Sequence, residues 1–393
     1  MKKLLVSALL ATTSCVTPQA SAPDDAALHR EILTLDTHLD TPAMFSRPGW
    51  SFADRHSYAT DIAQVDLPRM DDGNLDGGFF VVYIAQGPLT AEGYAAAGAF
   101  ASKRLGEIET MLARYPERIG LATAAPDAAR LDKAGKRSAY ISIENSYPLG
   151  ESVAGLAEFY RRGVRMASPV HFRNNQFADS ATDKPRWNGL SPLGRQWVAE
   201  MNRLGMVLDA SHASDAVLDQ MIAASRTPVI LSHTGAKAIF DHPRNLDDTR
   251  IRKLAASGGA ICMNSAYLAT MRSTPERSAL GDKLEAPGVT AAEQVELVRQ
   301  LRVLDQTQPV QDADFETYMR GLLHLIEVAG VDHVCFGADW DGGGGVRGFE
   351  DIEAHPKITA RLRAAGYSRA DLEKMWSGNV LRLLRTAEER KGR

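Results

Sequence analysis

Short apolar segments recur along the chain, and most of them are followed by a loop and then by a segment whose apolar residues have helical spacing. The apolar segments are rich in β-branched and aromatic residues, which is typical of buried strands. Residues 91–115 and 192–204 are two of the helical segments that separate them. The eight predicted strands are residues 31–40, 77–85, 138–145, 163–171, 205–212, 228–233, 258–265 and 332–342.

This alternation of strands and helices predicts a parallel sheet that is covered by helices. Eight such units in one chain favour a closed (β/α)₈ TIM barrel, formed as a single domain by residues 23–393. A doubly wound open sheet is the second choice, but no G-x-G-x-x-G turn follows the first strand. The segment 266–316 is long for a connection and contains three prolines, so we expect an insertion or lid over the barrel mouth.

The composition and charge of the chain are those of a globular protein and give no sign of a nucleic-acid-binding protein. The 393 residues are 44% hydrophobic and 24% charged, as in ordinary globular proteins. The formal net charge is −4, and no basic run is interleaved with aromatic residues, so the sequence gives no reason to expect a nucleic-acid partner. The apolar run at the N-terminus is shorter than the roughly 20 residues that a membrane span needs.

The N-terminus has the features of an export signal. Lys2 and Lys3 precede the apolar residues 4–11, and a triplet with small residues at its first and third positions ends at Ala22. We expect residues 1–22 to be a cleaved signal peptide and the mature protein to be exported, to the periplasm of a bacterium. Lipidation at Cys15, followed by membrane anchoring, is the close alternative.

Two cysteines, Cys262 and Cys335, remain after Cys15 is set aside. Both lie in apolar strand-like segments, so we expect two buried free thiols. A disulfide between them is the less favoured alternative, because bridges between neighbouring parallel strands are geometrically awkward.

Ionisable side chains stand at the ends of the predicted strands. Any one of them could cap a helix or hydrogen-bond a loop. In a barrel, however, the carboxyl ends of all strands meet at one rim, where active sites lie. We therefore expect them to converge, with Asp341 the weaker candidate because Asp before Gly is frequent in turns. The strand-end residues are His38, Asp40, Glu144, His171, His212, His233, Asp339 and Asp341.

The convergence of these groups predicts a metal site. His38 and Asp40 are two positions apart on an extended segment, so their side chains point to the same side. A buried ring of imidazoles and carboxylates without a cation would suffer repulsion and desolvation. Five candidate ligands are too many for one catalytic zinc ion, whereas two ions that share Glu144 divide them evenly: His38 and Asp40 on one ion, His212 and His233 on the other. The mixture of imidazole and carboxylate favours two Zn²⁺ per subunit, with Mn²⁺ or Co²⁺ as substitutes.

Several motifs, in this order, resemble the zinc-dependent membrane dipeptidases, the renal dipeptidase-like family. The resemblance extends over essentially the whole mature chain and implies a (β/α)₈ barrel with a binuclear zinc site. The motifs are DTHLDTP (36–42), IEN (143–145), VHFRNNQFAD (170–179), LDASH (208–212), LSHTGAKAIFDHPRN (231–245) and FGADWDG (336–342).

The same resemblance implies a role for each site residue. His38 and Asp40 correspond to the first ligand pair, Glu144 to the bridging ligand, and His212 and His233 to the ligands of the second ion. The implied substrate contacts are His171 at the carbonyl and Arg244 at the carboxylate, and Asp339 corresponds to the proton shuttle. The chain departs from the family pattern in NSYPLG after Glu144 and in HPRN at 242–245, and neither departure affects a ligand.

These observations predict a metallo-dipeptidase that hydrolyses dipeptides by attack of a metal-bridging hydroxide. The resemblance also suggests tolerance of a D-residue at the C-terminal position and assembly as a homodimer. The main alternative is another metal-dependent amidohydrolase on this fold, such as a lactonase or an N-acyl amino acid deacylase. Those enzymes usually begin with His-x-His, whereas this chain has His-x-Asp and Glu144. A catalytically silent binding protein that retains the barrel is a further alternative.

Overall fold

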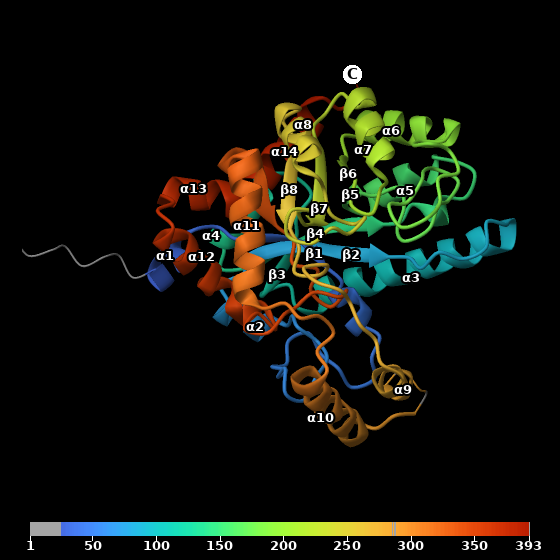
Figure 1. Ribbon diagram of the computed structural model, residues 1–393. Helices are drawn as coiled ribbons and strands as arrows, with labels where there is room; N and C mark the ends of the chain where they lie inside the picture. The colour runs from blue at the N-terminus through green and yellow to red at the C-terminus, as the bar shows by residue number, and fades with distance from the viewer. Residues whose placement is uncertain (1–24, 285, 287, 393) are drawn as a thin grey trace, which may run out of the picture.

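The structure is a computed structural model that describes residues 25–284, 286 and 288–392. The predicted signal peptide and Cys15 lie outside the described residues. A nine-stranded parallel sheet forms the centre of the molecule (Figure 1). Its strands are β1 (Leu35–Leu39), β2 (Gly77–Tyr83), β3 (Ile119–Leu121), β4 (Arg137–Glu144), β5 (Val164–Ala167), β6 (Val207–Asp209), β7 (Val229–Thr234), β8 (Ala260–Met263) and β9 (Val334–Phe336).

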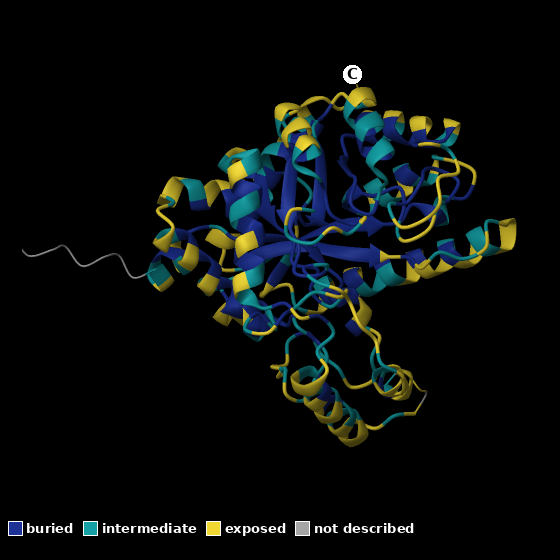
Figure 2. Cartoon of the chain, viewed as in Figure 1, coloured by how far each residue is buried: buried dark blue, intermediate teal, exposed yellow. Residues whose placement is uncertain are grey.

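Helices surround this sheet, and most exposed residues lie on these helices and on the loops, while the strands are mostly buried (Figure 2). None of the helices in the described part of the chain is long and apolar enough to cross a bilayer. The helices are α1 (Asp25–Glu31), α2 (Leu67–Asp72), α3 (Ala91–Arg114), α4 (Asp127–Lys133), α5 (Gly155–Arg161), α6 (Pro192–Leu204), α7 (Asp215–Ala224), α8 (Asp248–Ala256), α9 (Pro275–Leu284), α10 (Ala291–Thr307), α11 (Phe315–Ala329), α12 (His355–Ala364), α13 (Arg369–Glu373) and α14 (Asn379–Glu389).

Eight of the strands form the predicted barrel. They pair in the order β1-β2-β4-β5-β6-β7-β8-β9, and every pairing is parallel. A parallel bridge between Leu39 and Trp340 joins the two ends of this series, where the Asp40 amide donates to the Trp340 carbonyl at 2.8 Å. The TIM-barrel prediction is confirmed, and each of the eight predicted segments overlaps one of these strands.

The short strand β3 was not predicted. It pairs with the first residues of β4 outside the barrel series. Its three residues read Ile-Gly-Leu, and Leu121 is exposed. Ile119 is the buried residue of the three, and a segment this short with a central glycine is too brief to show the apolar alternation by which strands are recognised.

Local sequence signals fix the helices that connect the strands, as α6 illustrates. The Ser191 side chain accepts from the Gly194 amide as the N-cap, and Pro192 occupies the first turn, where its missing N–H costs nothing. Gly205 ends the helix at φ 76°, a left-handed conformation that glycine adopts without a steric penalty. Between these caps, Trp197 and Met201 share one face and are buried in the core.

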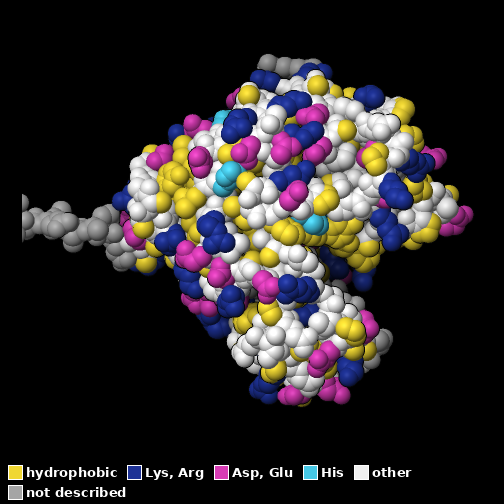
Figure 3. Space-filling model, in the orientation of Figure 1, with side chains coloured by type: hydrophobic (Ala, Val, Ile, Leu, Met, Phe, Trp, Pro, Cys, Tyr) yellow, Lys and Arg dark blue, Asp and Glu magenta, His cyan; other side chains and the backbone are white. Residues whose placement is uncertain are grey.

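The predicted insertion forms α9 and α10, which stand out below the barrel in Figures 1 and 3. It packs against the loop after β1: Tyr58 donates to Asp305 at 2.9 Å, and Arg302 donates to the carbonyls of Tyr58 and Asp61. Both segments follow the carboxyl end of a strand, so the insertion belongs to the rim at which the strand-end residues meet.

The expectation of two free thiols was wrong. Cys262 and Cys335 form a disulfide, and both residues are buried. They are direct register partners on β8 and β9, with their Cα atoms 4.1 Å apart. This register places both side chains on the same face of neighbouring strands, which brings the two sulfurs together despite the parallel pairing.

Candidate metal centre and active site

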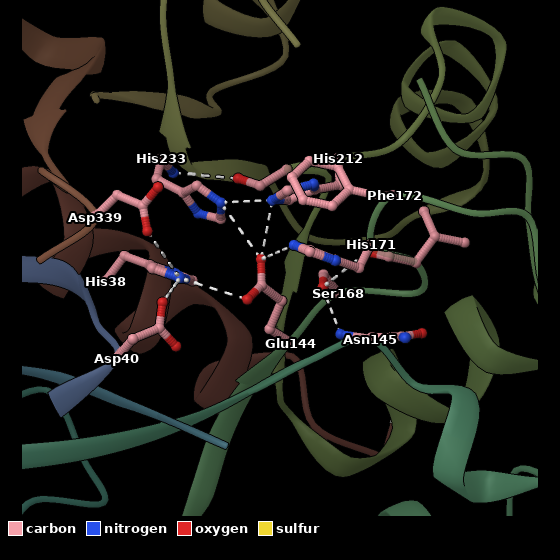
Figure 4. Close-up of polar contacts among 12 residues, drawn as sticks. His38, Asp40, Glu144, Asn145, Ser168, His171, Phe172, His212, His233 and Asp339 are labelled. Atoms are coloured by element: carbon pink, nitrogen blue, oxygen red, sulfur yellow. Dashed lines mark hydrogen bonds and ion pairs between the residues drawn. The ribbon is translucent and has the colours of Figure 1, made fainter. Parts of the chain in front are cut away.

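The strand-end residues meet at the carboxyl-terminal rim of the barrel (Figure 4). Each comes from the end of a different strand or from the loop that follows it, except that His38 and Asp40 share the end of β1. All are buried apart from His171, which is partly exposed. We call this set the rim cluster; it comprises His38, Asp40, Glu144, His171, His212, His233 and Asp339.

Glu144 lies at the centre of the rim cluster, and its two carboxylate oxygens face different histidines (Figure 4). Oε2 is 3.6 Å from Nε2 of His38. Oε1 is 3.0 Å from Nε2 of His212 and 3.4 Å from Nε2 of His233. This is the arrangement expected of a carboxylate that serves two neighbouring cation positions.

The remaining members extend the cluster on both sides. On one side, Nε2 of His38 is 3.2 Å from Oδ2 of Asp40 and 3.9 Å from Oδ1 of Asp339. On the other side, Nε2 of His171 is 3.9 Å from Oε1 of Glu144. The structure thus brings together all five predicted ligands, the predicted proton shuttle and the predicted carbonyl-binding histidine.

The chemistry of these atoms suits a cation. Glu144 Oε1 and His38 Nε2 are fully buried and make no hydrogen bond among the described residues, a costly state for polar atoms. Nε2 of His212 and Nε2 of His233 lie only 2.9 Å apart and face the same carboxylate oxygen. Three groups have ligand atoms close enough to share an ion: His38 with Glu144 and His233, Glu144 with His171 and His212, and His38 with Asp40 and Asp339.

Two members of the cluster have a strained backbone. His212 and Asp339 have φ values of 65° and 67°, in the left-handed region that residues with a Cβ rarely adopt. Such conformations cost about 1–3 kcal/mol each and persist where the surrounding structure enforces them, often at functional sites. Here they turn both side chains back toward the centre of the rim.

A sequence profile described as membrane dipeptidase, peptidase family M19, matches residues 24–393. The chain belongs to this family. It is accordingly a hydrolase that acts on the peptide bond of dipeptides, which confirms the predicted activity class. The predicted resemblance to the membrane dipeptidases is confirmed as well.

Curated relatives and solved structures agree with membership of the membrane dipeptidase family. Dipeptidase tcpJ of Claviceps purpurea is 30% identical over 344 residues, which cover 86% of this chain and 72% of the relative. Dipeptidase aclJ of Aspergillus oryzae is 30% identical over 380 residues, 93% of this chain and 81% of the relative. The probable dipeptidase PvdM of Pseudomonas aeruginosa superposes with a TM-score of 0.79 at 28% identity, covering 93% of this chain and 98% of that one.

A metallopeptidase from Rhodobacter sphaeroides, solved with a phosphinate mimic of the dipeptide L-Ala-D-Ala, shares the fold at a TM-score of 0.72. It is 24% identical, and the match covers 91% of this chain and 99% of that chain. Peptidase family M19, to which the chain belongs, is a family of metallopeptidases, which implies a metal-dependent activity for this dipeptidase.

Electrostatics in this dipeptidase prepare the rim for cations. Burial lowers the pKa of both His212 and His233 well below the usual value, and nearby positive charge adds to the effect, so both imidazoles are neutral and each has a free lone pair. Burial opposes the ionisation of Glu144, but the imidazoles of His171 and His38 outweigh it and hold its pKa well below the usual range. The pKa of His38 is raised well above its usual value, because Glu144 and Asp40 outweigh burial, so a cation that binds here displaces a proton from His38.

Asp339 differs from Glu144, because the pKa of its carboxyl is raised and not lowered. Burial raises the pKa of its carboxyl to about 8; His38 opposes the shift, and the negative charges of Asp40 and Glu144 add to it. A carboxyl group that takes up protons this readily can serve as a base and return the proton as an acid near neutral pH.

Arg244 lies beside the rim cluster rather than within it. Its guanidinium is buried, donates to the His233 carbonyl at 3.2 Å and stands over the Tyr267 ring at 5.7 Å. The buried Nε of Arg244 has no hydrogen-bond partner among the described residues. A buried guanidinium with an unused donor is suited to bind a carboxylate.

Sequence reasoning missed two aromatic side chains at this site. Tyr83, the register partner of Glu144 at the end of β2, has its ring centroid 4.8 Å from that of His171. The ring centroids of Phe172 and His212 are 5.0 Å apart. Both are exposed large apolar side chains, 36% and 42% respectively. The position of Tyr83 at a strand end was an available signal; nothing in the sequence distinguished Phe172.

The interpretation of Asp341 as a loop-capping residue agrees with the structure. Its carboxylate accepts hydrogen bonds from the Thr41 hydroxyl and the Gln64 amide, both at 2.6 Å. It thereby holds the loop after β9 against the loop after β1 and does not join the rim cluster.

Proposed function

We propose that this dipeptidase works with two zinc ions that are held by the rim cluster and share Glu144. One ion is held by His38, Asp40 and Glu144, and the other by Glu144, His212 and His233. The division is supported by the two carboxylate oxygens of Glu144, which face His38 on one side and His212 and His233 on the other. When bound, the ions supply an activated water molecule and polarise the scissile carbonyl.

The other residues of the site have complementary roles in the proposal. Asp339 accepts the proton of the attacking water and passes it to the leaving amine nitrogen, a role that its place at the edge of the cluster, with Oδ1 3.9 Å from Nε2 of His38, supports. His171 lies at the open side of the cluster and hydrogen-bonds the carbonyl oxygen, where negative charge develops. Arg244 holds the substrate carboxylate through its unused donor. The convergence of ligand-type groups on Glu144 is the observation that carries the proposal.

Tyr83 and Phe172 form an apolar wall beside His171, and we propose that this wall accepts a substrate side chain. Such a wall favours dipeptides with an apolar residue. The insertion with α9 and α10 packs on the loop after β1 and is proposed to act as the lid of the same site.

The proposed activity is tested with metal-free enzyme and a panel of L-L and L-D dipeptides, which includes L-Ala-D-Ala because the Rhodobacter sphaeroides neighbour holds a mimic of that dipeptide. An N-acyl amino acid and a lactone complete the panel. We expect dipeptide hydrolysis after zinc is restored and little turnover of the other two compounds. Full activity without metal, or preference for the lactone or the N-acyl amino acid, would contradict the proposal.

We further propose that the chain is exported and cleaved near Ala22. The disulfide between Cys262 and Cys335 supports an oxidising compartment, since such bonds are rare in reducing ones. Mass spectrometry of the mature protein checks this: the expected N-terminus lies just after Ala22, a lipidated Cys15 would favour the anchored alternative, and a retained Met1 would contradict export.

A further inference from the structure

A hydrogen-bonded chain of polar groups lies behind His233, on the side of the ring away from the rim cluster. Nδ1 of His233 is 2.9 Å from the Ser232 hydroxyl, and that hydroxyl donates to Oδ2 of Asp209 at 2.6 Å. All three residues are buried. The motifs LDASH and LSH supply them, yet sequence reasoning used only the histidines of these motifs.

The donors and acceptors of this chain can be assigned completely. The Asp209 carboxylate only accepts, and it receives the Ser232 hydroxyl hydrogen as well as the amide hydrogens of Ser211 and Ser232. The Ser232 oxygen is left with two lone pairs. They face two donors, the Ser211 hydroxyl at 3.1 Å and Nδ1 of His233. The Ser211 oxygen in turn accepts from the His233 amide at 3.1 Å.

This assignment fixes the tautomer of His233. Because the Ser232 oxygen can only accept from the ring, Nδ1 of His233 carries the hydrogen, and Nε2 carries the lone pair. That lone pair faces Glu144 and His212 (Figure 4). His212 differs: its Nδ1 is buried and has no hydrogen-bond partner among the described residues, so no such chain selects its tautomer.

We propose that Asp209 and Ser232 are positioning residues that hold His233 in the tautomer and orientation required to bind one of the two cations. Neither residue touches the substrate or the ion. The inference rests on the proposed metal site and adds to it the residues that prepare one ligand before any metal arrives. Groups behind a ligating histidine typically affect metal affinity about 10–100-fold.

The test is Asp209→Asn, a substitution that preserves shape and reverses one hydrogen bond. The Asn oxygen still accepts from the two backbone amides, but its NH₂ group points at the Ser232 oxygen and turns that hydroxyl toward Nδ1 of His233. The other tautomer is then favoured, with hydrogen on Nε2. Ser232→Ala removes the link altogether. Ser211→Ala is the matched control, because Ser211 contacts the same hydroxyl but not the ring.

Zinc affinity is measured by chelator competition on metal-free protein, together with thermal unfolding of that metal-free protein. We expect Asp209→Asn and Ser232→Ala to weaken the binding of one zinc ion about 10–100-fold and to leave the other unchanged. Ser211→Ala is expected to change neither affinity by more than about twofold, a much smaller effect than the loss of the ring contact. Unchanged affinity in Asp209→Asn, or an equal loss in Ser211→Ala, would overturn the inference. A wild-type protein that binds no zinc would instead overturn the proposed function.

Discussion

Two clusters of buried histidines in this chain have the same residue type and similar burial, but their surroundings differ. The rim cluster places four imidazoles among three carboxylates. The second cluster lies where α1 and α12 pack together and comprises His29, His355, Thr359 and Trp376. There, His29 bonds the Thr359 hydroxyl at 2.7 Å and the Gly73 carbonyl at 3.1 Å. We call it the helix cluster.

The difference between the surroundings of the two clusters shows which observation identifies a metal site. In the helix cluster no carboxylate contacts either histidine among the described residues, and His29 uses both ring nitrogens in hydrogen bonds to neutral groups. Each cluster contains a buried polar atom with no hydrogen-bond partner among the described residues, Glu144 Oε1 at the rim and His355 Nδ1 in the helix cluster. What separates the clusters is that the rim nitrogens converge on carboxylates. Burial of a histidine is therefore uninformative by itself, whereas convergence of lone pairs and anions calls for a cation.

The largest expected effect belongs to Asp339 in the rim cluster. Asp339→Asn removes the proposed proton carrier, so kcat should fall at least about 10³-fold, within the range of general acid–base catalysis. Zinc content is expected to remain at the wild-type value, measured by elemental analysis of the same samples. The exposed Asp312, changed to Asn, is the control. Near-normal turnover in Asp339→Asn would remove it from its role.

A substitution in the helix cluster should lower the stability of the protein and leave its activity unchanged. His29→Leu leaves the Thr359 hydroxyl and the Gly73 carbonyl without their buried partner, which is expected to lower the free energy of unfolding by about 1–3 kcal/mol. Zinc content and kcat are expected to be unchanged. Denaturant unfolding and a dipeptidase assay check both. Loss of zinc in this variant would erase the distinction between the two clusters.

Acid should destabilise the protein partly through the helix cluster. Burial lowers the pKa of His29 to about 4 and that of His355 to about 3, against 6.5 for the free side chain. These neutral histidines contribute stability that is complete above pH 6.5 and is lost as the pH falls toward 4, because the unfolded chain takes up the protons.

The loss amounts to about 1.4 kcal/mol per pH unit for each histidine in that window. Unfolding of metal-free protein between about pH 4.5 and 7 therefore should show a shallower slope for His29→Leu than for the wild type, since the rim histidines contribute equally to both. Identical slopes would contradict the account of His29.

The smallest effect concerns substrate choice at the rim. Phe172→Ala removes half of the apolar wall, so kcat/KM for dipeptides with a leucine side chain should fall about tenfold relative to glycine-containing ones, as for lost contacts in a hydrophobic pocket. Phe100, equally exposed on α3, provides the control variant Phe100→Ala. An unchanged ratio for Phe172→Ala would remove the wall from substrate binding.

The barrel and the convergence of the rim cluster could be predicted from the sequence because both follow from strand order. Parallel strands in a barrel place their carboxyl ends together, so residues as distant as His38 and Asp339 were predictable neighbours. The strand β3 was not predictable, since its three residues depend on pairing with β4 and not on their own pattern.

Other features depended on register and on side-chain direction. The disulfide requires Cys262 and Cys335 to be direct partners, and a shift of one residue would separate them. The hydrogen-bonded chain from Asp209 to His233 requires β6 and β7 to place three side chains in line. Strand order is encoded in the apolar pattern, whereas register is settled by the packing of the whole barrel.

The central claim is that the rim cluster, with Glu144 between its two halves, holds two zinc ions. Anomalous X-ray scattering from crystals of zinc-loaded enzyme, compared with Glu144→Gln, tests it most directly. The account predicts two zinc peaks in contact with Glu144 in the wild type and the loss of at least one in the variant. Active crystals with a single peak, or with zinc away from Glu144, would contradict it.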